Sequence, residues 1–342
     1  MTVTTTGSDR VAGRGVTGEP GTRTRLLPGP AVTPAPATRA RHVPGPPVTP
    51  VPAAGARPGS DPIAGRKSVN FKRLVADLRA LGVPAARPLI VHASLSRIGH
   101  VRGGAETVID ALLEVVGPTG TLVTGAGTPE NSTTSRAFLA RTARLGPDAL
   151  EQFRAKMPAF DRASTPTSVG AIAEVLRKWP GAQRSAHPQS SFAAVGREAK
   201  ALMAGHRVRC HLGEASPLAK LYDRDAMVLM LGVGYLSCSA FHLAEYRYRK
   251  HPPLRDYSCV VKKWGKHRWF RYRDVVLDDG DFETIGKHLK DVLEDEGTML
   301  SGHVGLAESH LIPIRRVVDL ASEWMGENRS LEPAGASRNR PW

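Results

Sequence analysis

Cysteine is scarce in this chain, with Cys210, Cys238 and Cys259 the only three among 342 residues. An odd number without a Cys-x-x-Cys pair excludes a disulfide framework and indicates a reducing compartment, so we expect a cytoplasmic protein. Cys238 and His242 have the spacing of metal ligands, but two groups do not make a site. We therefore predict no metal, and we interpret Cys238 as inert packing rather than as an acyl-carrying nucleophile.

Long apolar runs are also missing. None approaches the roughly 20 residues that cross a membrane, so we predict no membrane partner. Residues 1–66 lack the apolar core of a secretory signal, and their prolines exclude the amphipathic helix of a transit peptide. This segment is rich in Pro, Gly, Thr, Ala and Arg, and it cannot bury enough surface to offset the entropy of ordering. We predict that residues 1–66 form a disordered tail.

Acidic residues are in short supply, because 47 Lys and Arg face 32 Asp and Glu and give a formal charge of +15. A basic protein binds nucleic acid, phosphate-rich cofactors or acidic membranes. No zinc finger, helix-turn-helix or RNP signature appears, so a nucleic-acid-binding protein is a remote alternative and we predict no nucleic-acid partner. The hydrophobic fraction of 41% is enough for one large folded domain or two small ones.

The stretch 226–250 is the one that organises the rest. Met227–Leu231 is a continuous apolar run, typical of a strand buried on both faces. Two glycines stop the run, and Ser239 is suited to cap a helix that follows. His242 and Glu245 lie three residues apart and share a face of that helix. A base and a carboxylate at the end of a strand are placed for chemistry, although a structural histidine beside a surface glutamate remains open.

A second unit precedes it. A buried strand at 88–91, an amphipathic helix at 105–116 and a strand at 121–124 predict a parallel sheet with helices on its faces. The loop between the first strand and the helix carries small and basic residues, namely Ser94, Ser96, Arg97, Arg102, Gly103 and Gly104. Such a loop at a helix start suits a phosphate, with an ordinary polar turn as the alternative.

The remaining pattern adds further elements. We predict a first helix capped by Ser68, an antiparallel hairpin over 257–276, a helix over 282–293, a last strand over 299–307 and a final helix over 313–324. Asp278, Asp279 and Asp281 form an acidic cluster before the 282–293 helix. Residues 329–342 are predicted to be a frayed terminus.

Several segments together resemble one family. They occur in the order Val91–Thr121, MPAFDRASTP, RSAHPQSSFAAVG, SPLAKLY, MLGVGYLSCSAFHLAEY and GHVGLAESHLIPIRRVVDLA. This set resembles the aminoglycoside 3-N-acetyltransferases, the acyl-CoA-dependent antibiotic acetyltransferases that are unrelated to the GNAT fold. The resemblance covers residues 68 to 326.

The resemblance implies an α/β fold, an α/β/α sandwich around a largely parallel or mixed sheet, for a catalytic domain at 67–328. It implies transfer of an acetyl group from acetyl-CoA to the 3-amino group of a 2-deoxystreptamine aminoglycoside, which gives antibiotic resistance. The partners are then acetyl-CoA and the amino sugar, and the enzyme is a monomer or a homodimer. No metal is implied.

The resemblance also implies roles for single residues. His242 matches the catalytic histidine, and we expect Asp279 of the acidic cluster to orient it. Asp161, Glu245 and His187 match positions expected to contact the amino sugar or, for Glu245, to orient the histidine. The residues expected to hold CoA are Ser94, Leu95, Ser96, Arg102, Gly103 and Gly104.

One departure concerns the acceptor. After the strand at 121–124 the family usually has an MPTF-like segment, whereas this chain has TGAGTPEN in the loop that borders the acceptor pocket. The alternative function is therefore a related acyl-CoA-dependent N-acyltransferase that acts on another amine in a biosynthetic pathway. In either reaction an ammonium group cannot attack until a base removes a proton, and histidine is the natural base near neutral pH.

Overall fold

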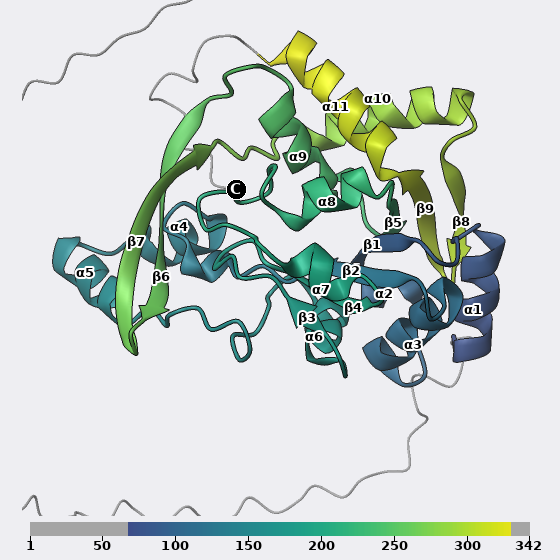
Figure 1. Cartoon of the computed structure of the whole chain (residues 1–342), viewed down its shortest axis with the longest axis horizontal. Coiled ribbons are helices and arrows are strands. Elements are labelled where there is room, and N and C mark those ends of the chain that lie inside the picture. Colours follow the sequence, from purple (N-terminus) through teal and green to yellow (C-terminus); the bar gives the residue numbers. More distant parts are fainter. Residues whose placement is uncertain (1–67, 330–342) are drawn as a thin grey trace, which may run out of the picture. The chain divides into compact units, whose positions relative to one another are not determined.

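The computed structural model describes residues 68–329, so the predicted tail at 1–66 and most of the predicted frayed terminus lie outside the described residues. A seven-stranded sheet with the order β3-β4-β2-β1-β5-β9-β8 forms the centre of the described part (Figure 1). Strand β1 pairs in parallel with β2 and β5, while the outer pairs are antiparallel. The sheet is therefore mixed with a parallel centre, and the predicted α/β class is confirmed.

The elements have the following bounds. The strands of the main sheet are β1 (Pro88–Ala93), β2 (Thr121–Gly125), β3 (Gln183–Arg184), β4 (Phe192–Gly196), β5 (Met227–Leu231), β8 (Leu300–Val304) and β9 (Ala307–Pro313). The two strands of the hairpin are β6 (Leu254–Lys263) and β7 (Lys266–Val275). The helices are α1 (Phe71–Ala80), α2 (Leu95–Ile98), α3 (Gly104–Val116), α4 (Arg136–Thr142), α5 (Pro147–Ala155), α6 (Ala171–Lys178), α7 (Ala199–Met203), α8 (Pro217–Asp223), α9 (Ala240–Arg247), α10 (Phe282–Asp295) and α11 (Ile314–Asn328), with short 3-10 turns η1 (Pro129–Asn131) and η2 (Tyr235–Ser237).

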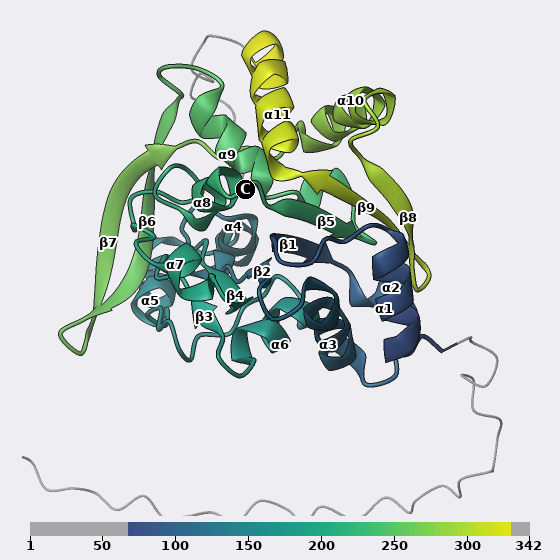
Figure 2. The ribbon, with the colours of Figure 1, turned by 45° about the vertical axis from the view of Figure 1, so that its right-hand side comes forward.

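The sheet is buried on both faces because its side chains alternate between two apolar layers. Ile90 points into a core with α7 to α11, whereas its neighbours Leu89 and Val91 point into a core with α1, α3 and α6. Figure 2 shows α9 to α11 on one side of the sheet and α3 and α6 on the other. A strand flanked in this way must be apolar throughout, which is why Met227–Leu231 has no polar break.

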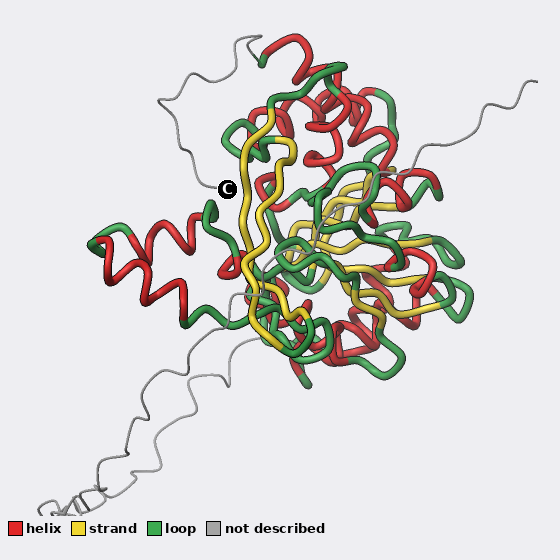
Figure 3. Tube along the Cα trace, turned by 60° about the vertical axis from the view of Figure 1, so that its left-hand side comes forward, coloured by secondary structure: helices red, strands yellow, loops and turns green. Residues whose placement is uncertain are grey.

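The hairpin β6–β7 stands apart from the main sheet (Figure 3). One of its faces packs Val260 against Phe138 and Met157, near α4 and α5. The Asn131 side chain holds the same residue, because its Nδ2 donates to the Val260 carbonyl at 2.9 Å and its Oδ1 accepts from the Val260 amide at 2.7 Å. The hairpin thus forms one wall of the region that follows β2.

Two local predictions are wrong for identifiable reasons. The cap of α1 is Asn70, whose side chain accepts from the Arg73 amide at 3.0 Å, rather than Ser68. The predicted last strand over 299–307 is two antiparallel strands, because Gly305, with φ of 64°, reverses the chain between β8 and β9. Among the helices of the described part, none is long and apolar enough to span a membrane.

Gly232, directly after β5, packs closely against Arg97 of α2 in the segment after β1. Its φ is 68°, and an added Cβ would lie 2.8 Å from the Cβ of Arg97 in α2 and 3.0 Å from that of Ala307. Gly181 also has a positive φ, of 77°, but nothing lies within 4 Å of its Cβ position. We expect Gly181→Ala to lower the free energy of unfolding by about 1 kcal/mol and Gly232→Ala by about 3 kcal/mol.

Urea unfolding of both variants measures this difference. Equal losses would show that α2 is not held against the end of β5 as described.

Candidate active site

His242 lies where the chain leaves the centre of the sheet. Strand β5 ends at Leu231, the η2 turn follows, and His242 is in the first turn of α9. Its side chain is 13% exposed, and its ring packs against Phe282 with 4.8 Å between ring centroids. The histidine is therefore held between α9 and α10 with a small part of its surface reachable from outside.

Glu245 fixes the orientation of the His242 ring. Its Oε2 lies 2.7 Å from His242 Nδ1, and the Glu245 side chain is fully buried. A carboxylate can only accept, so Nδ1 carries the hydrogen and Nε2 keeps its lone pair. The i, i+3 spacing on α9 creates this pair, as the sequence indicated, and it leaves Nε2 as the basic atom.

Asp279, by contrast, does not contact the histidine. Its carboxylate forms an ion pair with Arg136 at the start of α4. The acidic segment reaches the site through its backbone instead, because the amide of Asp278 donates to Glu245 Oε1 at 2.8 Å. The carboxylate that contacts His242 is thus that of Glu245, and Asp279 is paired with Arg136 instead.

Arg329 is a further partner of this carboxylate that sequence analysis missed. Its Nη1 donates to Glu245 Oε1 at 2.8 Å, and its Nε and Nη2 donate to the two oxygens of Asp281 at 2.8 and 2.7 Å. No motif marks an arginine at the far end of the chain as a neighbour of residue 245. Its isolated position just after a helix gave no signal.

His92 is a second histidine that sequence analysis did not single out. It lies on β1, and its Nε2 is 3.4 Å from the hydroxyl of Ser239, which we had expected to cap α9. Burial, with a smaller contribution from the nearby His242, lowers the pKa of His92 to about 4. His92 is therefore neutral near pH 7. A polar residue at the end of an apolar strand was the signal that could have revealed it.

The loop predicted to hold CoA lies next to this pair of histidines. The amide of Ser94 donates to the Leu231 carbonyl at 3.0 Å, which ties the loop to the end of β5. Gly103 and Gly104 have φ of 81° and 64°, a backbone that favours glycine. Arg102 is exposed, while Ser94 and Leu95 are partly buried and Ser96 is exposed. All six predicted residues thus belong to one turn at the sheet edge where His242 lies.

Asp161 serves its own loop. Its Oδ1 accepts from the amides of Ala163 and Ser164, both at 2.9 Å, and from the Ser164 hydroxyl at 3.0 Å. The hydrogen bond from the Ser164 amide is the main reason that the pKa of Asp161 is lowered. Asp161 also borders a pocket of about 430 Å³ together with Lys262. A basic neighbour and an internal cap do not favour the contact with a cationic acceptor that we predicted.

His187 is buried inside the protein. Its Nδ1 accepts from the amides of Gln189 and Ser190, at 3.2 and 3.1 Å, and its Nε2 donates to the Val208 carbonyl at 3.2 Å. Burial lowers the pKa of His187 well below its usual value, and His211 and His206 add to this effect. Both ring nitrogens of His187 are therefore occupied, and the side chain has no exposed surface.

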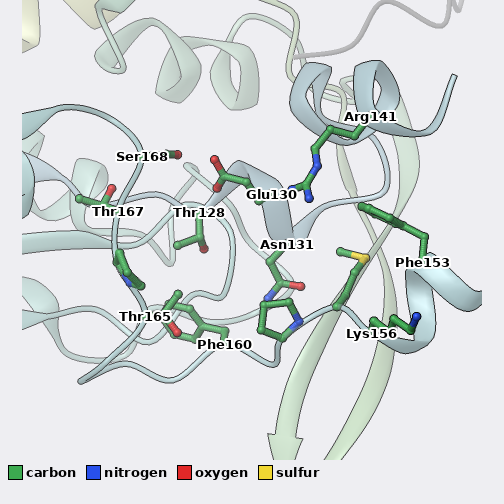
Figure 4. Close-up of a pocket in the computed structure, with 13 residues that line it drawn as sticks. Thr128, Glu130, Asn131, Arg141, Phe153, Lys156, Phe160, Thr165, Thr167 and Ser168 are labelled. Atoms are coloured by element: carbon green, nitrogen blue, oxygen red, sulfur yellow. The ribbon is translucent and has the colours of Figure 1, made fainter. Parts of the chain in front are cut away.

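A larger pocket lies beyond β2, at the TGAGTPEN loop. Its volume is about 560 Å³, and its walls come from η1, α4, α5 and residues 157–168 (Figure 4). Phe153, Met157 and Phe160 form an apolar part, and Glu130 is the carboxylate among the lining residues. Two cations, Arg141 and Lys156, also line the pocket. None of the residues predicted to bind substrate is among them.

Metal chemistry receives no support from the geometry. Among residues 68–329, no group of three or more His, Cys, Asp or Glu side chains is placed to hold a metal ion. Cys238 is buried, and burial raises its pKa to about 12, so its thiol is not a ready nucleophile. The arrangement at His242 is a partly exposed histidine with a buried carboxylate behind it.

Comparison with known proteins identifies a family for this chain. Residues 90–326 match the family described as aminoglycoside 3-N-acetyltransferase. The SPbeta prophage-derived aminoglycoside N(3')-acetyltransferase-like protein YokD of Bacillus subtilis (strain 168) is 35% identical, covering 77% of this chain and 96% of that protein. Aminoglycoside N(3)-acetyltransferase VII of Streptomyces paromomycinus is also 35% identical, covering 77% of this chain and 94% of that enzyme.

Solved structures give the same result. The crystal structure of YokD aligns with a TM-score of 0.70 and 34% identity, over 77% of this chain and 95% of that one. The binary complex of AAC-IIIb with CoASH aligns with a TM-score of 0.65 and 26% identity, over 76% of this chain and 97% of that one.

The buried side chain of His206 is expected to make the stability of the folded protein sensitive to acid. Burial lowers the pKa of His206 to about 4, so between pH 6.5 and pH 4 the unfolded chain binds a proton that the folded chain does not. The free energy of unfolding should therefore fall as the pH falls through this window, by up to about 3 kcal/mol for this one group. We expect His206→Gln to flatten the pH dependence measured by urea unfolding.

His303→Gln, at an exposed position on β8, is the matched control and should keep the slope of the parent protein. Parallel curves for the His206→Gln variant and the parent protein would contradict the prediction.

Proposed function

The chain belongs to the aminoglycoside 3-N-acetyltransferase family, and we propose that it transfers the acetyl group of acetyl-CoA to the 3-amino group of a 2-deoxystreptamine aminoglycoside, with His242 as the general base. The observation that carries this proposal is the pair of His242 and the buried Glu245 beside the turn at 94–104. The enzyme is an acetyltransferase, and the proposal concerns its donor, its acceptor and its base.

His242 Nε2 removes a proton from the ammonium group of the acceptor, which gives the nitrogen the lone pair that it needs to attack the acyl carbon. Glu245 balances the positive charge that then develops on the His242 ring and keeps the ring in place. When the C–N bond has formed and the C–S bond breaks, the imidazolium returns its proton to the departing sulfur. The second proton that the attacking nitrogen must lose passes to solvent, which leaves a neutral amide and the CoA thiol. The histidine thus ends in the state in which it began.

We assign CoA to the turn at 94–104, and the CoASH-bound structure of the related AAC-IIIb supports CoA as the donor. Acetyl-CoA supplies the acyl group as a thioester. Ser94, Leu95 and Ser96 would line the pantetheine, and Gly103 and Gly104 let the backbone approach closely. Because Glu106 already occupies the first turn of α3, the phosphates depend on exposed arginines such as Arg102 rather than on the helix end alone.

The pocket of about 560 Å³ is the natural place for the acceptor, and its charges favour a second candidate function. An aminoglycoside carries several ammonium groups, yet Glu130 is the one carboxylate that lines this pocket, against Arg141 and Lys156. Like charges at short distance disfavour a polycation. The second candidate is therefore the same acyl transfer to another amine, with an apolar part and fewer positive charges, in a biosynthetic pathway.

His242→Ala tests the base. We expect kcat to fall by about 10²–10⁴-fold because the imidazole that takes the proton is removed, while CoA still binds. Turnover is followed by thiol release and CoA binding by calorimetry. His288→Ala, which changes an exposed histidine on α10, is the control. Near-parental turnover of His242→Ala would remove His242 from the mechanism.

A panel of amine acceptors with acetyl-CoA separates the two candidate functions. The first predicts thiol release with 2-deoxystreptamine aminoglycosides such as kanamycin. The second predicts no thiol release with aminoglycosides and thiol release with amines that carry an aromatic or carboxylate group. For the amines with a carboxylate, KM should rise in the Arg141→Ala variant. Aminoglycoside turnover at high kcat/KM that Arg141→Ala does not change would discard the second candidate.

A further inference from the structure

Arg329 is the residue directly after α11, three positions beyond the end of the family match at residue 326. We had assigned it to a frayed terminus, but its side chain is 16% exposed and donates four hydrogen bonds to three residues. Two of these form a fork on the carboxylate of Asp281, a third goes to the Asp278 carbonyl at 2.9 Å, and the fourth goes to Glu245. The guanidinium is thus built into the site behind His242.

The packing of α11 aims Arg329 at this point. Helix α11 buries Val317, Val318 and Ala321 in the same core as Phe241 and Leu243 of α9 (Figure 1). The amide of Arg329 still donates to the Met325 carbonyl at 3.0 Å, so the residue closes the last turn of the helix. Because the helix is fixed against α9, its last residue has a fixed distance to the carboxylate on α9.

The charge of Arg329 matters because Glu245 is fully buried. A buried carboxylate without a cation is costly, and before the reaction His242 must be neutral in order to act as a base. Arg329 is then the cation that compensates Glu245. Burial by itself would lower the pKa of Arg329, but the bonds to Asp281 and the charge of Glu245 outweigh burial and raise that pKa, so the guanidinium stays charged.

We propose that Arg329 is a positioning residue for the reaction: it holds the Glu245 carboxylate against His242 Nδ1 and, through its charge, sets the pH at which His242 becomes a free base. This inference rests on the proposed role of His242.

The sign of the effect follows from the charges around the ring. The groups that act on His242 or its carboxylate are His92 on β1, Glu245 on α9, His211 in the adjoining core and Arg329 after α11. Arg329 also pairs with Asp281, and Asp279 of the same segment is paired with Arg136 of α4. Removing Arg329 takes away a positive charge and leaves two carboxylates, Glu245 and Asp281, without their shared cation. A proton then binds to the His242–Glu245 pair more readily, so His242 becomes a free base only at higher pH.

Arginine is needed for this task rather than any cation. Its planar fork meets both oxygens of Asp281 while a third nitrogen reaches Glu245. A lysine ammonium at the same place keeps the charge, but as a single atom it cannot reach two carboxylates and the Asp278 carbonyl in these directions. Charge and positioning therefore have separate signatures in variants.

Arg329→Gln is the principal test. We expect the acid limb of the pH profile of kcat/KM to move to higher pH by about one unit, because one charge near the pair has been removed. The ring titration of His242, followed by NMR and assigned with His242→Gln, should move in the same direction by a similar amount. CoA binding should stay as in the parent protein, because the turn at 94–104 makes no contact with Arg329.

Arg316→Gln is the matched control, since Arg316 lies on the same helix and forms an ion pair with Glu296 far from the site. It should leave both the profile and the ring titration unchanged. A folded Arg329→Gln protein with an acid limb within about 0.2 units of the parent protein, or one shared with Arg316→Gln, overturns the proposal.

Arg329→Lys keeps the proposal testable if the glutamine variant does not fold. It should keep the acid limb near that of the parent protein, because the positive charge remains. It should lower kcat several-fold, because the Glu245 carboxylate is no longer held in position. A shift of the acid limb in the lysine variant would assign the effect to packing and contradict the role of charge. If His242→Ala stays active, the proposed function fails, whereas the His242 ring titration still measures whether Arg329 acts on it.

Discussion

The site depends on a single hydrogen bond, the one from His242 Nδ1–H to Glu245 Oε2 at 2.7 Å. It decides which nitrogen of the ring is basic, and it does so from a position that water does not reach, because Glu245 is fully buried. Much of the surrounding structure serves that carboxylate. Helix α9 provides the spacing, the Asp278 amide and Arg329 take up the second oxygen, and α11 carries Arg329 to its place. A buried charge that is satisfied on every side is rigid, and rigidity is what a general base requires.

The parts of this arrangement that sequence could predict are those with a local cause. The apolar run at 227–231 requires a strand buried on both faces, and the i, i+3 spacing requires His242 and Glu245 to share a helix face. The direction of the Asp279 side chain could not be predicted, because residues in a loop have no fixed direction until the loop is folded. The Asp278 amide turned out to face Glu245, while the Asp279 carboxylate turned toward Arg136.

Other features could not be predicted because they depend on contacts between distant segments. His187 looks in sequence like a site residue, yet its segment is folded into a core where backbone amides and a carbonyl occupy both nitrogens. Arg329 is 84 positions from Glu245, and nothing in either neighbourhood announces their pairing. The family resemblance implied the reaction, but it did not indicate these contacts, because they depend on tertiary packing.

The pocket proposed for the acceptor and the proposed base, His242, are held in place mainly by different elements of the fold. Asn131 lines the pocket, and its side-chain amide is hydrogen-bonded through Nδ2 and Oδ1 to the backbone of Val260. This wall of the pocket is therefore held by the hairpin, which lies far along the chain. His242 packs against Phe282 of α10 instead. Substitutions in α5 are therefore expected to change acceptor recognition without disturbing proton transfer, whereas α4 reaches Asp279 through Arg136 and β7 reaches α9 through the hydrogen bond from Tyr246 to Asp274. In such a scaffold a new acceptor is acquired by remodelling one wall, and the chemistry is inherited unaltered.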